Sequence, residues 1–209
     1  MLSGEHVCRC CDKKLLDKQA YHALCCSLGE STKGHNRARD VLHAGFSVSD
    51  PGAATEVEGL IASAPTLRPA DILTAAAHPT HLVAADVGIC APHAQDAGFD
   101  CTETMKQAKM RKHEPHLEEL QRHGLCYEPA TISCYGRRHP DTTKMMTLAA
   151  RRAARYRGLP DHRALLKRWF RTLAAEVWRR AARMVRACLP GEMGLAELLL
   201  DGERAVDAQ

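Results

Sequence analysis

The sequence has no apolar run that approaches the roughly 20 residues needed to span a bilayer. Its first residues, MLSGEHVCRCC, lack the hydrophobic stretch of a secretory signal, so we expect no export signal. Aromatic residues make up only 4% of the chain, and we find no internal repeat or low-complexity tract. These absences predict a soluble intracellular protein without a membrane partner. Its 209 residues suffice for one domain with a core and a small appendage.

Cysteine, by contrast, is abundant, with ten residues in doubled or closely spaced groups near histidines. The groups CRCC and HALCC favour thiolate chemistry in a reducing compartment over a disulfide framework. Four cysteine and histidine ligands can close a tetrahedral Zn²⁺ site and order a segment too small for its own core. Clustered thiols without a metal are the alternative. The expected zinc ligands are Cys8, Cys10, His22 and Cys25, with Cys11 in place of Cys10 and Cys26 in place of Cys25 left open.

The net charge of +4 hides a strong asymmetry along the chain. Residues 151–188 carry 12 Lys and Arg against two acidic residues, whereas residues 1–150 carry 16 basic against 18 acidic residues. A segment this basic suits a polyanion, most simply nucleic acid, although a solvated helix face rich in arginine is the alternative. The candidate contacts to nucleic acid are Arg151, Arg152, Arg155, Lys167, Arg168 and Arg171.

Hydrophobic spacing predicts helices over residues 31–45, 101–124, 141–157 and 161–188, and strands over 71–73, 81–90 and 125–135. Residues 46–48 alternate as at the beginning of a strand, and residues 56–60 fit either a short strand or the approach to one. We expect Pro115 to kink or restart its helix, because proline lacks an amide donor. We expect Pro129 to keep the first part of its strand outside the ladder. The last helix has an amphipathic stripe, which favours packing on the core.

This order predicts an α/β fold, in which helices flank a small mixed sheet. The expected divisions are a zinc knuckle over 1–30, an α/β core over 31–140, basic amphipathic helices packed on that core over 141–188, and a disordered tail over 189–209.

Two aspartates lie next to apolar strand residues in the segment RPADILTAAAHPTHLVAADVGICAP. The strand around Asp86 is nearly continuous in hydrophobic residues, as expected of a central strand buried on both faces. A charged Asp86 there is costly unless it is paired, and a divalent metal shared with Asp71 is one solution. The alternative is that Asp71 only opens a strand and Asp86 meets a buried arginine. Glu56 is a possible third carboxylate.

Metal-dependent hydrolysis also needs a group that orients or deprotonates water. That group would often be a lysine two residues beyond the second acid, but this position is Gly88. Lys106 and Lys109 lie on the helix that follows, and a lysine projecting from that helix can occupy the same place.

Taken in order, these motifs resemble the C-terminal region of non-LTR retrotransposon polyproteins, over about residues 8–185. The matching residues are Cys8-x-Cys10, Tyr21-His22-Ala23-Leu24-Cys25, His35-Asn36 with Asp40, Glu56 before Gly59-Leu60, Arg68-Pro69-Ala70-Asp71, Asp86-Val87, Lys106-Gln107-Ala108-Lys109, Pro129 and Tyr135-Gly136.

The resemblance implies a zinc knuckle followed by a restriction-endonuclease-like, PD-(D/E)xK domain that nicks DNA with Mg²⁺ or Mn²⁺. Asp71 and Asp86 would hold the ion, Glu56 would assist, and Lys109 or Lys106 would position water. DNA would be the partner, with element RNA as a second one, and the location would be nuclear. A catalytically inactive, zinc-dependent nucleic-acid-binding remnant is the alternative, and an interaction protein that uses the helix 166–188 is a third.

Overall fold

The computed structural model describes residues 6–17, 19–26 and 29–189. A hairpin of β1 (His6–Val7) and β2 (Leu15–Leu16) opens the described chain, followed by α1 (Tyr21–Cys25) and α2 (Gly29–Ser47). The remaining elements are β3 (Ala54–Thr55), β4 (Ile72–Thr74), β5 (Leu82–Cys90), α3 (Cys101–Arg122), β6 (Leu125–Ser133), α4 (Pro140–Tyr156) and α5 (Arg163–Cys188). Among the described residues, no helix is both long enough and apolar enough to cross a bilayer.

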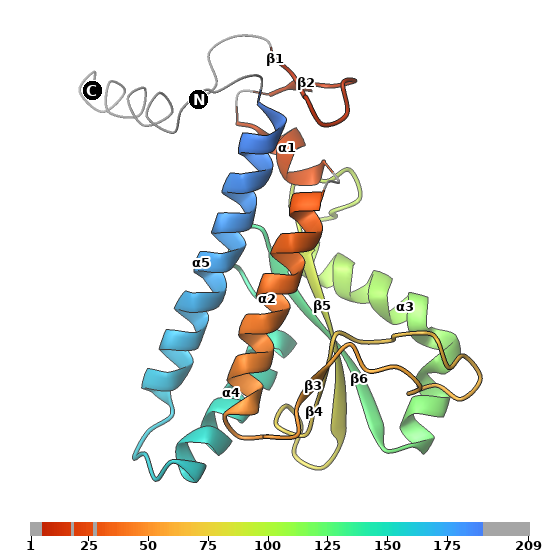
Figure 1. Ribbon diagram of the computed structural model, residues 1–209, viewed down its shortest axis with the longest axis vertical. Coiled ribbons are helices and arrows are strands. Elements are labelled where there is room, and N and C mark those ends of the chain that lie inside the picture. The colour runs from red at the N-terminus through yellow and green to blue at the C-terminus, as the bar shows by residue number, and fades with distance from the viewer. Residues whose placement is uncertain (1–5, 18, 27–28, 190–209) are drawn as a thin grey trace.

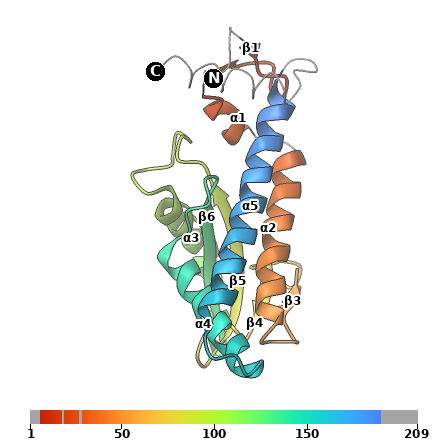
Figure 2. The same ribbon diagram turned by 90° about the vertical axis from the view of Figure 1, so that its left-hand side faces the viewer.

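A four-stranded mixed sheet with the order β3-β4-β5-β6 forms the centre of the molecule. The first three strands are antiparallel, while β5 and β6 run parallel from the pair Leu82–Leu125 to the pair Cys90–Ser133. A parallel pair needs a crossover connection, and α3 provides it. Helix α3 covers one face of the sheet, and α2 and α4 cover the other, with α5 packed along α2 (Figures 1 and 2). The expected small mixed sheet flanked by helices is therefore confirmed.

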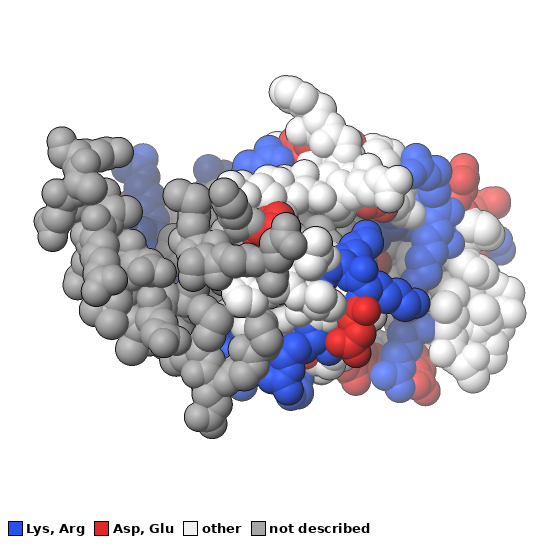
Figure 3. Space-filling view, turned by 90° about the horizontal axis from the view of Figure 1, so that it is seen from above, with Lys and Arg blue, Asp and Glu red and all other residues white. Residues whose placement is uncertain are grey.

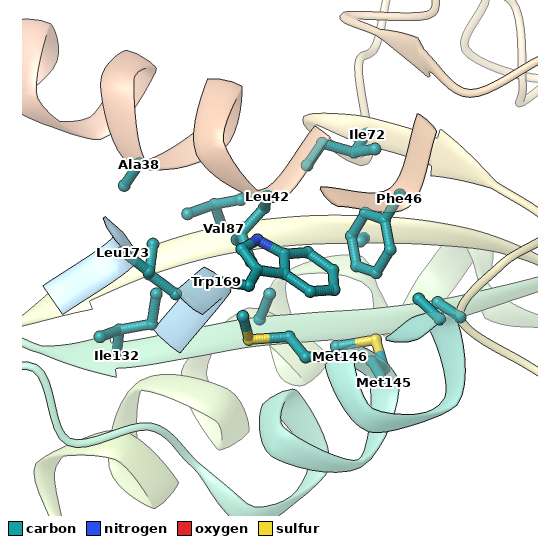
Figure 4. Packing of buried hydrophobic residues seen from close by; sticks show 14 of the residues in the cluster. Ala38, Leu42, Phe46, Ile72, Val87, Ile132, Met145, Met146, Trp169 and Leu173 are labelled. Carbon is teal, nitrogen blue, oxygen red and sulfur yellow. The ribbon is translucent and has the colours of Figure 1, made fainter. Parts of the chain in front are cut away.

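The main core lies between the sheet and the helices α2, α4 and α5. Figure 4 shows Leu42 and Phe46 of α2 around Trp169 of α5. The Trp169 indole N–H donates to the carbonyl of Val41 at 2.9 Å, and its ring meets Phe46 edge-on with centroids 5.2 Å apart. This contact requires Gly45, because a Cβ there would lie 2.0 Å from Trp169 Cε2.

The strand expected to begin at 46–48 is wrong, and the short strand expected near 56–60 lies slightly earlier in the chain. Residues 46–47 belong to the last turn of α2, because Phe46 follows Leu42 by four residues and enters the core from the same helix face. The strand expected over 56–60 is replaced by the two-residue β3, which ends before Glu56. The backbone of Glu56 has a φ of 54°. That left-handed conformation ends the strand.

Of the two predictions about proline, only the one about Pro129 is wrong. Helix α3 contains the exposed Pro115 and continues to Arg122 without a restart, and Figure 1 shows that its two halves run in different directions, as expected of a helix kinked by proline. Pro129 lies within β6 opposite Asp86 of β5, and β6 is an edge strand, where a missing amide can be tolerated. Of the expected tail, Leu189 is buried, and residues 190–209 lie outside the described residues.

Candidate functional site

The sheet brings the two aspartates of the sequence motif together. Asp71 immediately precedes β4, and its backbone N–H donates to the carbonyl of Ala85 on β5 at 3.0 Å. Its Oδ2 accepts a hydrogen bond from the backbone N–H of Val87 at 2.7 Å. Since Ala85 and Val87 face the main core, the intervening Asp86 points to the opposite face, toward α3. Neighbouring strands therefore present both carboxylates to one region.

Lys109 of α3 reaches Asp86, with 2.5 Å between its Nζ and Asp86 Oδ1. Gly88 makes room for this side chain, because a Cβ at position 88 would lie 2.7 Å from Lys109 Cε. The side chain of Lys109 thus lies over Gly88, the strand position at which a lysine would often be expected. The partner of Asp86 is this lysine and not the buried arginine that was considered as an alternative.

Lys106 and Glu56 do not contact the two aspartates in the way that Lys109 does. Lys106 forms an ion pair with Asp141 at the start of α4. Glu56 forms ion pairs with Arg39 and, at 3.4 Å, with Arg68. Both side chains therefore have opposite charges as their closest partners, and Lys109 is the lysine that accompanies the aspartates.

An open cavity of about 290 Å³ lies over the aspartates. It contains three carboxylates and three cationic side chains, so an anion and a cation could be held side by side there. The lining residues are His35, Glu56, Arg68, Ala70, Asp71, Asp86, Lys109, Lys112 and His113.

Three further side chains that sequence reasoning did not assign contact the aspartates. The Tyr127 hydroxyl donates to Asp86 Oδ2 at 2.7 Å, and His35 Nε2 lies 3.2 Å from Asp71 Oδ1. His113 Nε2 lies 3.9 Å from Asp86 Oδ2, while its buried Nδ1 has no hydrogen-bond partner among the described residues. Only the strand register and the helix placement reveal these contacts. His35 was visible in the sequence as part of the resemblance, without a role.

The surroundings shift the pKa values of these groups in different directions. Burial raises the pKa of Asp71, but hydrogen bonding and charge from His35 and the Val87 amide outweigh it, so its pKa lies below the usual range. Burial, followed by the charge of Asp86, raises the pKa of Tyr127, so its hydroxyl stays a donor. Burial also lowers the pKa of His113, partly offset by Asp86, which favours the neutral ring.

A second group of ligand-type side chains lies in the N-terminal hairpin and α1. One ligand atom from each of Cys8, Cys11, His22 and Cys26 lies within 4.8 Å of all the others. The Sγ atoms of Cys8 and Cys26 are 3.9 Å apart, and Cys11 Sγ lies 3.3 Å from His22 Nε2. Zn–S bonds of about 2.3 Å in a tetrahedron place sulfurs roughly 3.8 Å apart, so this cluster could hold a metal ion such as zinc.

The structure corrects two of the expected zinc ligands. The turn that starts at Cys8, closed by the Asp12 N–H donating to the Cys8 carbonyl at 2.8 Å, brings Cys11 into the cluster in place of Cys10. Cys25 is exposed, whereas Cys26 is buried in the cluster. Cys26 therefore takes the place expected for Cys25.

The thiols of the cluster differ in their electrostatic surroundings. Burial raises the pKa of Cys8, but backbone amides of Cys10 and Cys11 more than compensate, and its pKa is lowered. Backbone amides of Lys13 and Lys14 lower the pKa of Cys11. Burial raises the pKa of Cys26 to about 12. Backbone donors directed at thiol sulfurs favour the thiolate form that binds metals.

Comparison with protein-family models, curated proteins and solved structures finds no match. What the chain can do is therefore inferred from its two sites. The cavity combines carboxylates with a lysine and a buried tyrosine, which suits binding of a hard divalent cation beside an anion. The thiol cluster suits a softer ion.

The basic residues expected to contact nucleic acid divide into two kinds. Arg152 is half-buried and donates to the carbonyls of Ala75 and, at 2.9 Å, of Pro79, so it holds the turn between β4 and β5. The other five are exposed: Arg151, Arg155, Lys167, Arg168 and Arg171. Additional cations, Arg68 and Lys112, lie at the cavity itself. On the face seen in Figure 3, Lys and Arg side chains form a band across the right-hand half of the described surface.

Proposed function

We propose that this chain is a metal-dependent DNA endonuclease domain of retrotransposon origin, which hydrolyses phosphodiester bonds to nick DNA. The observation that carries the proposal is the convergence of Asp71, Asp86 and Lys109 on one cavity between β4, β5 and α3. The fold would be a restriction-endonuclease-like core with an N-terminal zinc knuckle, and a nuclear location would follow from a chromosomal substrate.

The residues at the cavity fit a Mg²⁺ or Mn²⁺ ion. Magnesium is held in proteins by one or two carboxylates and keeps several waters, so Asp71 and Asp86 suffice as protein ligands. The buried Tyr127 hydroxyl and the Val87 amide fix the orientation of one oxygen on each aspartate. When bound, such an ion supplies charge stabilisation at the phosphate and lowers the pKa of a coordinated water.

The chain's own cations would position the scissile phosphate and the attacking water. Lys109 is only 19% exposed at its side chain and is held at Asp86, so its ammonium group is preorganised at the edge of the cavity. A positioned donor of this kind stabilises charge that develops in the transition state. Arg68 and Lys112 line the same cavity and can attract the flanking phosphates.

The zinc knuckle would support DNA binding indirectly. Zn²⁺ held by Cys8, Cys11, His22 and Cys26 would order the N-terminal loop, whose two short strands contain only four residues in all. The exposed Arg and Lys residues of α4 and α5 would then add non-specific contacts to phosphates.

A plasmid-nicking assay tests the proposal. With Mg²⁺, the wild-type chain is expected to convert supercoiled plasmid to the open circle, and Asp86→Asn or Asp71→Asn is expected to abolish the reaction. Asp141→Asn is the matched control, because Asp141 pairs with Lys106 outside the cavity. Nicking that persists at the wild-type rate in Asp86→Asn would show that the site is assigned wrongly.

A catalytically inactive, zinc-dependent nucleic-acid-binding module is the second candidate. One observation favours it: all four oxygens of Asp71 and Asp86 already have partners within the chain. It predicts salt-sensitive DNA binding without cleavage under any divalent metal. Binding that falls linearly on a plot of log affinity against log salt, in a preparation that never nicks DNA, would favour this candidate over the nuclease.

A further inference from the structure

A second set of thiols adjoins the zinc-knuckle cluster. The Sγ atoms of Cys8, Cys10 and Cys188 lie within 4.8 Å of one another. Cys8 belongs to both sets, and Cys188 is the last residue of α5, far away in sequence. Cys8 and Cys188 are both 0% exposed. The two ends of the described chain therefore meet at one group of sulfurs.

Both backbone and side-chain hydrogen bonds join the end of α5 to the N-terminal loop. The N–H of Arg9 donates to the carbonyl of Cys188 at 3.1 Å, and the Cys10 thiol donates to the carbonyl of Ala187 at 3.1 Å. Leu189 is 2% exposed and packs in the same small core as Leu16. The end of α5 is thus seated against the loop at several points, which fixes the position of Cys188.

The first set is complete without the additional thiols. Cys8, Cys11, His22 and Cys26 give the four ligands of a closed structural zinc site. Cys10 and Cys188 remain beside Cys8, and a group of thiolates selects soft or borderline ions such as Zn²⁺ over Mg²⁺ or Ca²⁺. Three protein ligands and one solvent ligand form the usual coordination of an open zinc site.

We propose that the N-terminal loop binds two zinc ions, the second one held by Cys8, Cys10 and Cys188 with the Cys8 thiolate shared between the ions. The second ion links the C-terminal end of α5 to the N-terminal loop. It is the more exchangeable of the two, because the chain supplies only three ligands to it. This proposal is independent of DNA cleavage, since none of its ligands lines the cavity of Asp71 and Asp86.

Native mass spectrometry of the full chain, purified with Zn²⁺ and a reductant, measures the number of bound ions directly. We expect two zinc ions per wild-type chain and one in Cys10→Ser and in Cys188→Ser. Cys25→Ser and Cys101→Ser are matched controls outside both sets and are expected to keep two. Cys10→Ser guards against misfolding, because Cys10 is only half-buried and a serine hydroxyl can still donate to the carbonyl of Ala187.

A hydrogen-exchange experiment gives a second reading of the link to α5. Partial chelation that removes one ion is expected to raise exchange at the last turn of α5 in the wild type and to leave exchange there unchanged in Cys10→Ser. One zinc ion in the wild type, or two in both Cys10→Ser and Cys188→Ser, would overturn the proposal. Either result leaves the nicking assay untouched, so this proposal and the nuclease proposal can fail separately.

Discussion

Replacing Gly88 by alanine is the most direct perturbation of the candidate nuclease site, because it adds one methyl group beside Lys109 and removes no charge from the site. Gly88 lies on β5 two residues after Asp86, on the same face of the strand. A Cβ there would lie 2.7 Å from Lys109 Cε and 3.1 Å from Met105 Cγ. Carbon atoms in contact prefer a separation of about 3.5–4.0 Å, so the lysine must move by roughly 1 Å.

The expected cost in stability is small, and the expected cost in activity is large. The atoms displaced belong to flexible side chains, which places the overpacking at the low end of about 1–3 kcal/mol. Alanine offsets about 0.5–1 kcal/mol of this by restricting the unfolded chain. The change separates Lys109 from Asp86, and loss of one preorganised donor lowers a catalytic rate by about 10²–10³-fold.

Plasmid nicking and thermal unfolding, measured side by side, test this reasoning. Gly29→Ala is the control, because a Cβ at position 29 meets no atom within 4 Å. A Gly88→Ala chain that nicks at the wild-type rate would refute the role given to Lys109. The double change Gly88→Lys with Lys109→Ala, which moves the lysine onto the strand, is expected to recover part of the activity that Lys109→Ala loses.

Three further predictions concern stability and charge. The pKa of His113 is lowered by burial, so below about pH 6.5 the unfolded chain binds this proton more readily than the folded chain. The free energy of unfolding should therefore fall as the pH drops from 7 to 5. In urea titrations at several pH values, His113→Phe should show a weaker dependence of this free energy on pH than the wild type. An equal dependence in the two chains would contradict the prediction. Arg152→Ala removes two hydrogen bonds to exposed turn carbonyls and should lose about 0.5–1.5 kcal/mol. Arg151→Ala should leave the melting temperature unchanged and weaken salt-sensitive DNA binding. The reverse pattern would show that the two arginines are misassigned. Trp169→Ala should cost about 3–5 kcal/mol by chemical denaturation, against a much smaller loss for the exposed Trp178→Ala, and similar losses would contradict the core described here.

The elements that could be predicted from the sequence are those with an unambiguous hydrophobic period. The apolar run of β5 indicated a central strand, and β5 indeed lies between β4 and β6 with both faces covered. Residues 46–48 were ambiguous, because three alternating residues fit a strand as well as the end of a helix. The spacing from Leu42 to Phe46 decides in favour of the helix, and it becomes decisive only when the core partner Trp169 is known.

The sites depend on contacts that the sequence does not display. Doubled cysteines leave the zinc register open, and only the turn after Cys8 selects Cys11. The pairing of Asp86 with Lys109 required the crossing of α3 over β5, and its contact with Tyr127 required the register of β6. The role of Cys188 beside the N-terminal loop could not be predicted, because it depends on the full length and direction of α5.

The position of Pro129 has a consequence for how copies of this chain can associate. Exposed sheet edges invite pairing with strands of other molecules and so promote aggregation. Here one edge, β6, carries a proline that cannot donate to a new ladder, and the other edge, β3, is only two residues long. The sheet therefore offers little to an incoming strand on either side, and self-association through β-sheet extension is disfavoured.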